Sequence, residues 1–375
     1  MASVWVVLLE GRPGDGVAGG AVTSIGERLK VARYAAGLSQ RDLAEAAGVS
    51  AMAVSKYERD LDTPSSGVLI RLAQALDVRT GYFLRAVTIT VSAPAYRRRR
   101  SLPRKQERAI IAQIQEWLER YLDGESLFGG PPEFELPSTL DRRATSLDTA
   151  ERVAIDLRQG WNLGLAPIES LMEVLEDRGI KVGLIEGRED FDSLAFWVDD
   201  AIPVIVVKRD VPGDRQRFNL AHELGHLVLE ITGGADGEAA AYRFAGAFLV
   251  PEPVARFELG DRRRTLGLHE LHLLKHKYGL SMQAWVYRAK DLGILSEPAA
   301  ARLFREFRQQ GWRREEPGDQ IPPEEPGRLK RLVLRAMAED LVSRSRVAEL
   351  LNMPLAQFYE KEAERHGGFP AAVHR

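Results

Sequence analysis

The segment His222-Glu-Leu-Gly-His226 constrains the fold of this chain more than any other feature of its sequence. Two histidines four residues apart lie on one face of an α-helix, about one turn apart, so both imidazoles can reach the same metal ion. Glu223 between them can take a proton from a water on that metal. The flanking residues contain no proline until Pro251. The pattern therefore predicts an amphipathic helix that carries a metal site, with Glu223 as a general base.

The stretch after this motif contains one carboxylate that can complete the site. Residues 237–250 are rich in alanine and end just before Pro251, and Glu238 is their only acidic residue. A catalytic zinc takes three protein ligands and leaves one position open, and two histidines with a glutamate from the next helix meet this need. Two alternatives stay open, because Glu238 could instead stabilise the N-terminus of its helix and Asp236 could cap it.

Longer runs around these residues resemble a known family, the ImmA/IrrE metallo-endopeptidases. The resemblance covers about residues 145 to 320 and implies Zn2+ as the cofactor, with His222, His226 and Glu238 as ligands and Glu223 as the general base. The chain departs from the family at Tyr242, where many members carry Asn, Asp or His. The similar runs are Arg217-Phe-Asn-Leu-Ala-His-Glu-Leu-Gly-His226, Arg243-Phe-Ala-Gly-Ala-Phe-Leu-Val-Pro251, Leu274-Lys275, Tyr278-Gly-Leu-Ser-Met282, Tyr287-Arg-Ala-Lys-Asp-Leu-Gly-Ile294 and Gly311-Trp312.

Peptide hydrolysis also needs a hydrogen-bond donor for the negative charge that develops on the carbonyl oxygen. Tyr242, His272 and His276 are candidate oxyanion or substrate contacts by their chemistry. Apolar residues between positions 266 and 277 recur at helical spacing. This spacing favours the alternative, in which the histidines of that helix lie on a solvated face.

A second pattern occupies residues 25–84. Ser39 as N-cap and Gly48 as stop delimit a short helix, and Ser50 caps a further helix over residues 51–59. A glycine-containing turn between two short helices is typical of a helix-turn-helix. The expected core consists of Leu29, Leu38, Leu43, Ala44, Val49, Val54, Tyr57, Leu69, Leu72, Ala73 and Leu76. The block resembles the phage-repressor (XRE) DNA-binding domain, including Glu58 after the second helix and Pro64 before the next one.

The XRE resemblance implies that the second helix of the pair enters the major groove of double-stranded DNA. Its first exposed residues are apolar, so direct readout of bases would depend mainly on Lys56. Gln40 resembles the glutamine with which the family contacts phosphate. The candidate DNA contacts are Gln40, Ser50, Ala51, Met52, Ser55, Lys56 and Arg59.

The charge of this block is only weakly positive, with nine Lys and Arg against seven Asp and Glu between Ser24 and Arg85. Phosphate contacts dominate affinity for DNA, so a single copy is expected to bind weakly. We therefore expect a homodimer on a two-fold operator. The alternative is a helix-turn-helix used only for protein contacts.

Composition limits which other classes of protein this chain could belong to. The 375 residues have 45% hydrophobic content and a net charge of −2, which excludes a general nucleic-acid-coating protein. The chain has no cysteine, so only histidines and carboxylates are strong zinc ligands. No window approaches the length of a membrane helix, and residues 3–9 are too short and lack the basic start of a signal peptide. We expect a cytoplasmic protein.

The expected fold class is α+β, with an all-α N-terminal domain, a zincin-like metallopeptidase domain and a small helical C-terminal region. The expected segments are a disordered tail (1–23), the helix-turn-helix domain (24–86), a basic linker with a connecting helix (87–145), the zinc peptidase domain (146–320) and the C-terminal helical region (321–375).

Alternating apolar residues predict several strands in this chain. One lies in the linker at Val87–Val91, and residues 181–185, 193–198 and 203–207 form a sheet ahead of the metal helix. Ala195–Val198 is the expected edge along which an extended substrate adds. In the C-terminal region, residues 341–355 resemble a second helix-turn-helix that binds either DNA or protein.

Two functions of different class follow. The first is a DNA-binding transcription regulator whose zinc endopeptidase cleaves itself or a partner regulator, since the resemblance implies cleavage of a repressor. Self-cleavage between residues 86 and 145 would separate DNA binding from catalysis. The second is an antitoxin-like repressor whose metal domain binds a co-encoded toxin without proteolysis. A metal sensor is a third alternative, and the intact Glu223 favours the enzyme.

Overall fold

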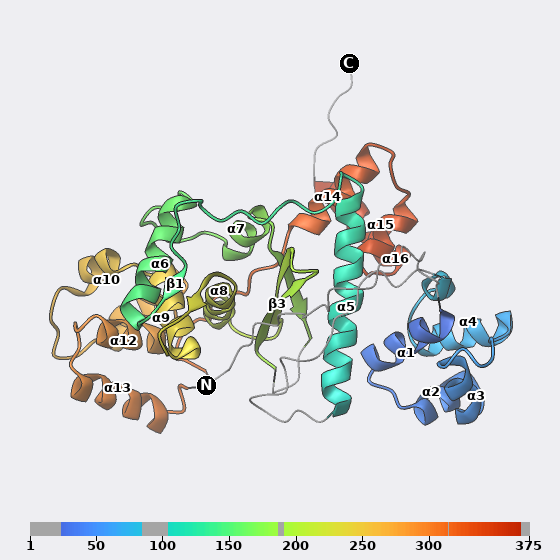
Figure 1. Ribbon diagram of the computed structural model, residues 1–375, viewed down its shortest axis with the longest axis horizontal. Coiled ribbons are helices and arrows are strands. Elements are labelled where there is room, and N and C mark those ends of the chain that lie inside the picture. The colour runs from blue at the N-terminus through green and yellow to red at the C-terminus, as the bar shows by residue number, and fades with distance from the viewer. Residues whose placement is uncertain (1–23, 85–103, 187–190, 314, 369–375) are drawn as a thin grey trace, which may run out of the picture. The chain divides into compact units, whose positions relative to one another are not determined.

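The structure is a computed structural model that describes residues 24–84, 104–186, 191–313 and 315–368. These residues form two compact units (Figure 1), of which one contains residues 104–111 and 133–325 and the other contains residues 24–84, 112–132 and 326–368. Among the described helices, none is long and apolar enough to cross a membrane. The mixture of helices with small sheets confirms the α+β class.

The N-terminal helices have the arrangement that the sequence predicts. Ser39 accepts a hydrogen bond from the amide of Asp42 and begins α2, and Gly48 ends α2 with a φ of 64°. Glycine adopts this left-handed conformation without the steric cost of a Cβ. Ser50 accepts from the amide of Ala53 and begins the next helix. The elements are α1 (Ile25–Ala35), α2 (Gln40–Ala47), α3 (Ala51–Tyr57), α4 (Ser66–Ala75) and a 3-10 helix, η1 (Thr80–Leu84).

The eleven residues expected in the core of this domain do pack together. Seven of them are buried, and Leu38, Val49, Tyr57 and Leu69 are partly buried against the same cluster. Helix α3 ends at Tyr57, two residues before the predicted end at Arg59, because the chain turns with Asp60 at a positive φ.

The rest of this unit is also helical. Residues 112–126 are part of helix α5 (Arg104–Ser126), which lies where the sequence predicts a connecting helix, and Arg28 of α1 pairs with Glu119 on it. The C-terminal helices are α14 (Arg328–Ala338), α15 (Arg344–Leu350) and α16 (Leu355–Gly368). Ser343 caps α15, and Asn352 turns the chain with a φ of 51°, as the second helix-turn-helix pattern predicts. DNA binding by these helices stays a prediction.

The other unit contains the metal helix, α8 (Gly213–Val228). Its larger sheet contains the three strands predicted at 181–185, 193–198 and 203–207, and the last of them extends over 202–208. Ser170 caps the helix before this sheet, so that helix begins at Leu171. The remaining elements are β1 (Arg143–Ala144), α6 (Leu147–Gly160), α7 (Leu171–Asp177), β2 (Lys181–Ile185), β3 (Ser193–Val198), β4 (Ile202–Lys208), β5 (Glu230–Ile231), α9 (Gly237–Leu249), α10 (Glu252–Leu259), α11 (Leu268–Tyr278), α12 (Met282–Asp291) and α13 (Glu297–Gln309).

The larger sheet of this unit has the strand order β2-β4-β3. Strand β2 is parallel to β4, and β3 is antiparallel to it, with Ala195 opposite Ile205. Strand β3 therefore lies at an edge of the sheet, as the sequence predicts for residues 195–198. The second sheet pairs β1 with β5 in parallel.

Helix α8 lies in the core of its unit, between the sheet and the helices α6 and α9 (Figure 1). Gly225 permits the close approach of α9, since a Cβ at this position would lie 3.1 Å from the ring of Phe244 and 3.3 Å from Cα of Ala241. The glycine between the two histidines therefore lies at a tightly packed contact between α8 and α9.

Three sequence predictions lie outside the described residues. They are the disordered tail 1–23, the strand Val87–Val91 and the part of the basic linker up to residue 103.

Candidate metal centre and nucleic-acid interface

Helix α8 brings its two histidines to one point. His222 is 3% exposed, and its Nε2 lies 3.3 Å from Nε2 of His226. One helical turn separates the two residues, so their rings meet on the same face. Burial within the core restricts the positions that these rings can take.

Glu238 joins the two histidines from α9. Asp236 is the N-cap of this helix and accepts hydrogen bonds from the amides of Glu238 and Ala239. Because Asp236 fills the capping role, the carboxylate of Glu238 lies instead beside the histidines, with Oε2 3.7 Å from Nε2 of His222 and Oε1 3.8 Å from Nε2 of His226.

The three side chains fit a metal ion. Their ligand atoms lie within 4.8 Å of one another, and no other group of three His, Asp or Glu residues in the described part of the chain does so. Ligand atoms placed about 2.0–2.1 Å from a tetrahedral zinc ion are about 3.3 Å apart. The two histidine nitrogens, 3.3 Å apart, match this value. Each oxygen of Glu238 lies 3.7–3.8 Å from one of these nitrogens, so the carboxylate would move closer to the histidines to bind the ion.

Glu223 lies beside this cluster and is fully buried. Its burial raises the pKa of its carboxyl well above the ordinary value, opposed by the side chain of Ser193 and the backbone amide of Ala195 and reinforced by the charge of Glu238. A divalent cation at the cluster would lower this pKa again. Ser193 and Ala195 belong to β3, so the carboxyl lies between the metal helix and the edge strand. The sequence reasoning did not associate these two residues with Glu223, because 30 and 28 positions separate them from it.

Tyr242, where the chain departs from the family that it resembles, packs against a histidine of the cluster. Its ring centroid lies 4.3 Å from that of His222 and 6.0 Å from that of Phe218. Tyr242 follows Glu238 by one turn of α9, which places it beside the same cluster. Phe218 was not among the predicted site residues, although it precedes His222 by one turn on α8.

The other two candidate oxyanion residues have different neighbours. His272 and His276 lie on α11 with ring centroids 4.6 Å apart, and Nε2 of His276 lies 3.1 Å from the carbonyl oxygen of Asp319. Neither belongs to the group of side chains that could hold a metal ion. Their role in an oxyanion site stays a prediction without a contact to support it.

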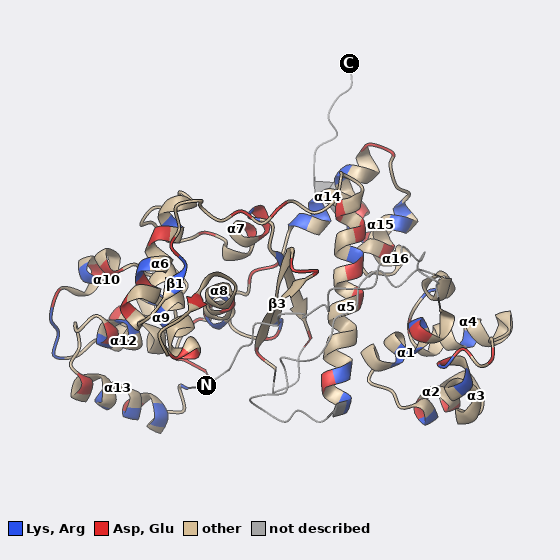
Figure 2. Ribbon diagram, in the orientation of Figure 1, with Lys and Arg blue, Asp and Glu red and all other residues tan. Residues whose placement is uncertain are grey.

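The predicted DNA contacts surround the N-terminus of α2 and follow α3. Met52, Lys56 and Arg59 are exposed, and Met52 is 70% exposed. Ser50 caps α3, and the guanidinium of Arg59 donates to the carbonyl of Ser55 on the previous turn. Figure 2 shows that both helices of this pair, α2 and α3, carry basic residues.

Gln40 is held in place by a buried ion pair. Its Nε2 donates to Oε2 of Glu58 at 2.7 Å, and the same carboxylate accepts two hydrogen bonds from the guanidinium of Arg33. The side chains of Arg33 and Glu58 are only 7% and 4% exposed. The sequence reasoning named Glu58 but missed Arg33, whose place in a helical apolar pattern gives little indication of an ion pair.

Comparisons with known proteins match both halves of the chain. Residues 29–83 match the helix-turn-helix family, and residues 176–290 match the peptidase M78 family, described as an IrrE N-terminal-like domain. A segment of 61 residues, 16% of the chain, is 39% identical to the HTH-type transcriptional regulator ImmR of Bacillus subtilis (strain 168). That segment spans about half, 48%, of the relative's length. The chain thus combines an XRE-type helix-turn-helix domain with an ImmA/IrrE-like domain of the peptidase M78 family.

Proposed function

We propose that this protein is a DNA-binding transcription regulator whose ImmA/IrrE-like domain is a zinc-dependent endopeptidase. The observation that carries the proposal is the convergence of His222, His226 and Glu238, whose ligand atoms lie within 4.8 Å of one another, with Glu223 beside them. A domain that only bound a partner would not require a carboxyl buried next to the metal ligands, because burying it is costly.

His222, His226 and Glu238 would hold the zinc ion and leave one position open. Zinc bound there supplies a Lewis acid that polarises a peptide carbonyl and acidifies water. Glu223 takes the proton of the attacking water and returns it to the leaving nitrogen. Its buried position keeps that proton from exchanging freely with solvent.

Strand β3 is the proposed binding edge for the substrate. Its side chain Ser193 and its backbone at Ala195 lie beside Glu223, so a peptide paired with this edge would pass next to the general base. Backbone hydrogen bonds at a strand edge bind an extended peptide with little dependence on its sequence. The sequence preference would then come from pockets beside the metal.

The substrate is a partner protein in this proposal, because one self-cut does not separate the two units. The chain leaves the DNA-binding unit near residue 132 and returns near residue 326. A cut between residues 127 and 145 leaves the second connection intact. A cut between residues 85 and 103 leaves Arg28 paired with Glu119, and the hydroxyl of Tyr82 bound to Glu116 at 2.6 Å.

On the DNA side, we propose that α3 enters the major groove and that two copies bind a two-fold operator. Gln40, Ser55 and Arg59 would contact phosphate while Lys56 reads bases, which agrees with the exposure of α3. The name of the similar Bacillus protein, a transcriptional regulator, supports a role in transcription for this domain.

The test is proteolysis of co-encoded partner proteins by the purified chain with zinc, comparing wild type with Glu223→Gln. Glutamine keeps the shape of the side chain but cannot take a proton, so zinc should remain bound while cleavage falls by about 10²–10⁴-fold. Cleavage by both proteins would point to a contaminating protease. Absence of cleavage by either, with one zinc bound per chain, would favour the antitoxin-like repressor that only binds its partner.

A further inference from the structure

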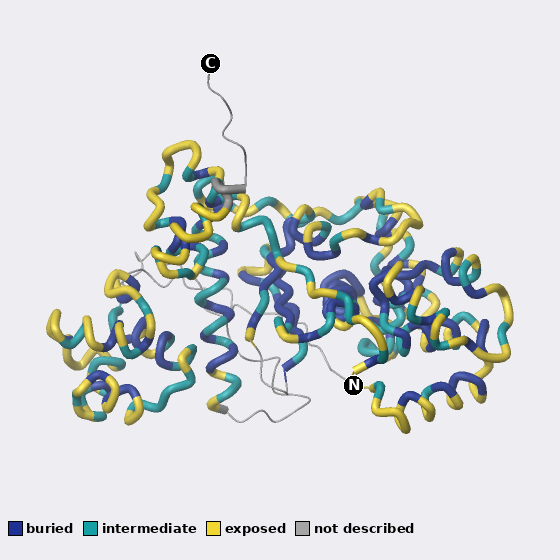
Figure 3. Tube along the Cα trace, turned by 180° about the vertical axis from the view of Figure 1, so that it is seen from behind, coloured by how far each residue is buried: buried dark blue, intermediate teal, exposed yellow. Residues whose placement is uncertain are grey.

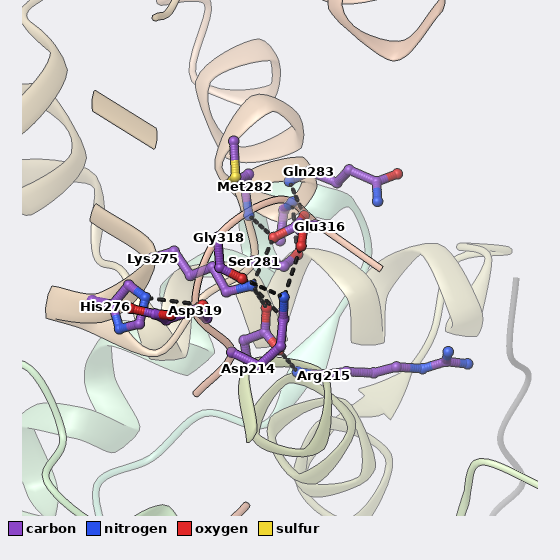
Figure 4. Close-up of polar contacts among 12 residues, drawn as sticks. Asp214, Arg215, Lys275, His276, Ser281, Met282, Gln283, Glu316, Gly318 and Asp319 are labelled. Atoms are coloured by element: carbon purple, nitrogen blue, oxygen red, sulfur yellow. Dashed lines mark hydrogen bonds and ion pairs between the residues drawn. The ribbon is translucent and has the colours of Figure 1, made fainter. Parts of the chain in front are cut away.

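A segment without helix or strand crosses the N-terminal half of the metal helix. We call residues 316–325, which follow α13 and precede α14, the strap. The sequence shows it only as a proline-rich break. Figure 4 shows one end of the strap, where Glu316 points toward Lys275 and Asp214.

The first anchor of the strap is a buried charge cluster. Nζ of Lys275 lies 3.2 Å from Oδ2 of Asp214 and 3.2 Å from Oε2 of Glu316, and the Lys275 side chain is fully buried. The carboxylate of Glu316 also accepts hydrogen bonds from the amides of Met282 and Gln283 at 2.9 and 3.0 Å. This cluster therefore ties the strap to the first turn of α8, to α11 and to the start of α12.

The second anchor is a close backbone contact. The amide of Gly213 donates to the carbonyl of Ile321 at 2.8 Å. A Cβ at Gly213 would lie 2.3 Å from the carbonyl oxygen of Pro322, which is too close for any side chain. The first residue of α8 is thus in direct contact with the strap.

The third anchor is Glu324. Its carboxylate pairs with Arg217 of α8 and accepts from the amide of Met172 at 2.8 Å and from the hydroxyl of Ser170 at 3.2 Å. The amide of Glu324 donates to the side chain of Gln216 at 2.7 Å. One strap residue therefore joins two residues of α8 to the start of α7.

All three anchors contact the same part of the metal helix. Gly213, Asp214, Gln216 and Arg217 lie in the first half of α8, and His222 follows Arg217 by five residues on the same helix. A rigid helix transmits displacement along its axis, and small displacements of a ligand change metal affinity strongly. We propose that the strap positions α8 so that His222 and His226 meet Glu238, with Glu324 as its main positioning residue. This proposal rests on the metal site proposed above.

The test uses the full chain and measures zinc affinity by competition with a chromogenic chelator. Glu324→Gln leaves the buried Arg217 without its charged partner, and we expect zinc binding to weaken by about 10–100-fold. Glu258→Gln is the matched control, because Glu258 joins α10 to α11 through Lys277 and Tyr278 without touching a ligand helix. Glu258→Gln should lower the melting temperature and leave zinc affinity unchanged. Glu325→Gln, in an exposed pair with Arg209, should change neither.

A second measurement tests in metal-free protein whether the strap holds α8 in place. Hydrogen exchange of the amides of residues 216–221 in metal-free protein should be faster in Glu324→Gln than in wild type or Glu258→Gln. If Glu324→Gln does not fold, Gln216→Met removes the bond to the strap amide without leaving a charge unpaired. A lower melting temperature with unchanged zinc affinity and unchanged exchange would overturn the proposal. If the wild type binds no zinc, the metal site fails and the exchange result alone decides the strap.

Discussion

The metal centre and the DNA-binding surface depend on the fold in different ways. The proposed metal ligands come from two helices, and their atoms converge within 4.8 Å inside a packed core. The proposed DNA contacts lie within 20 residues of sequence and are exposed or half-buried. Figure 3 shows the contrast, with α8 largely dark blue and the short helices of the N-terminal domain edged in yellow. A buried centre is sensitive to small shifts of its helices, whereas an exposed surface needs only a stable helix with the right side chains.

The same contrast appears in the ion pairs that support each region. Arg33 and Glu58 are 25 residues apart and hold Gln40 within one small domain. Arg217 and Glu324 are 107 residues apart and hold the metal helix against a distant segment. The Arg33–Glu58 pair can therefore form within one small domain, while the Arg217–Glu324 pair forms only when the whole unit has folded.

The loss of a proposed metal ligand should have the largest effect, and this effect should be confined to one of the two regions. His226→Ala removes one of three donors, and we expect zinc binding to weaken by about 3–4 kcal/mol, which is several hundred-fold. DNA binding by the same variant should be unchanged, because the ligands belong to the other unit. Chelator competition and DNA titration on one preparation measure both. His272→Ala is the control, and equal loss of zinc in that variant would place the metal elsewhere.

A weaker effect, on the helix-turn-helix domain and not on the metal centre, is expected from Glu58→Gln. Arg33 then remains buried without a carboxylate and Gln40 loses its charged acceptor, so the helix-turn-helix domain should lose about 2–3 kcal/mol of stability. Urea unfolding of the full chain measures this loss, and zinc affinity should not change. Glu45→Gln, an exposed carboxylate on α2, is the matched control. A change in zinc affinity with Glu58→Gln would show that the two regions are coupled.

The smallest effect is expected from Lys56→Ala on the exposed face of α3. Loss of a base contact should weaken binding to a DNA fragment selected by the wild type by about 1–2 kcal/mol, with little effect on stability. Lys30→Ala on α1 is the control, since Lys30 is exposed outside the helix pair. A uniform loss of affinity for all sequences, with a smaller salt dependence, would assign Lys56 to phosphate instead.

Most of the secondary structure could be predicted because its signals are local. The caps Ser39 and Ser50, the left-handed Gly48 and the alternating residues of β2 and β3 act within a few positions of themselves. The start of α7 is another local signal, because Ser170 accepts a hydrogen bond from the amide of Glu173 and caps the helix. The domain boundaries remain a prediction, and the compact units group residues 326–368 with the N-terminal domain rather than apart from it.

The sequence by itself determined the candidate metal ligands. Helical periodicity places His222 and His226 on one face, and a single carboxylate in the following helix leaves Glu238 as the partner. Only the tertiary structure decided that Asp236 takes the capping role, that β3 lies beside Glu223, and that Glu324 anchors the metal helix. The physical reason is the range of each interaction. A helical turn relates residues four apart by backbone geometry alone, whereas residues about a hundred apart meet only through the packing of the core between them.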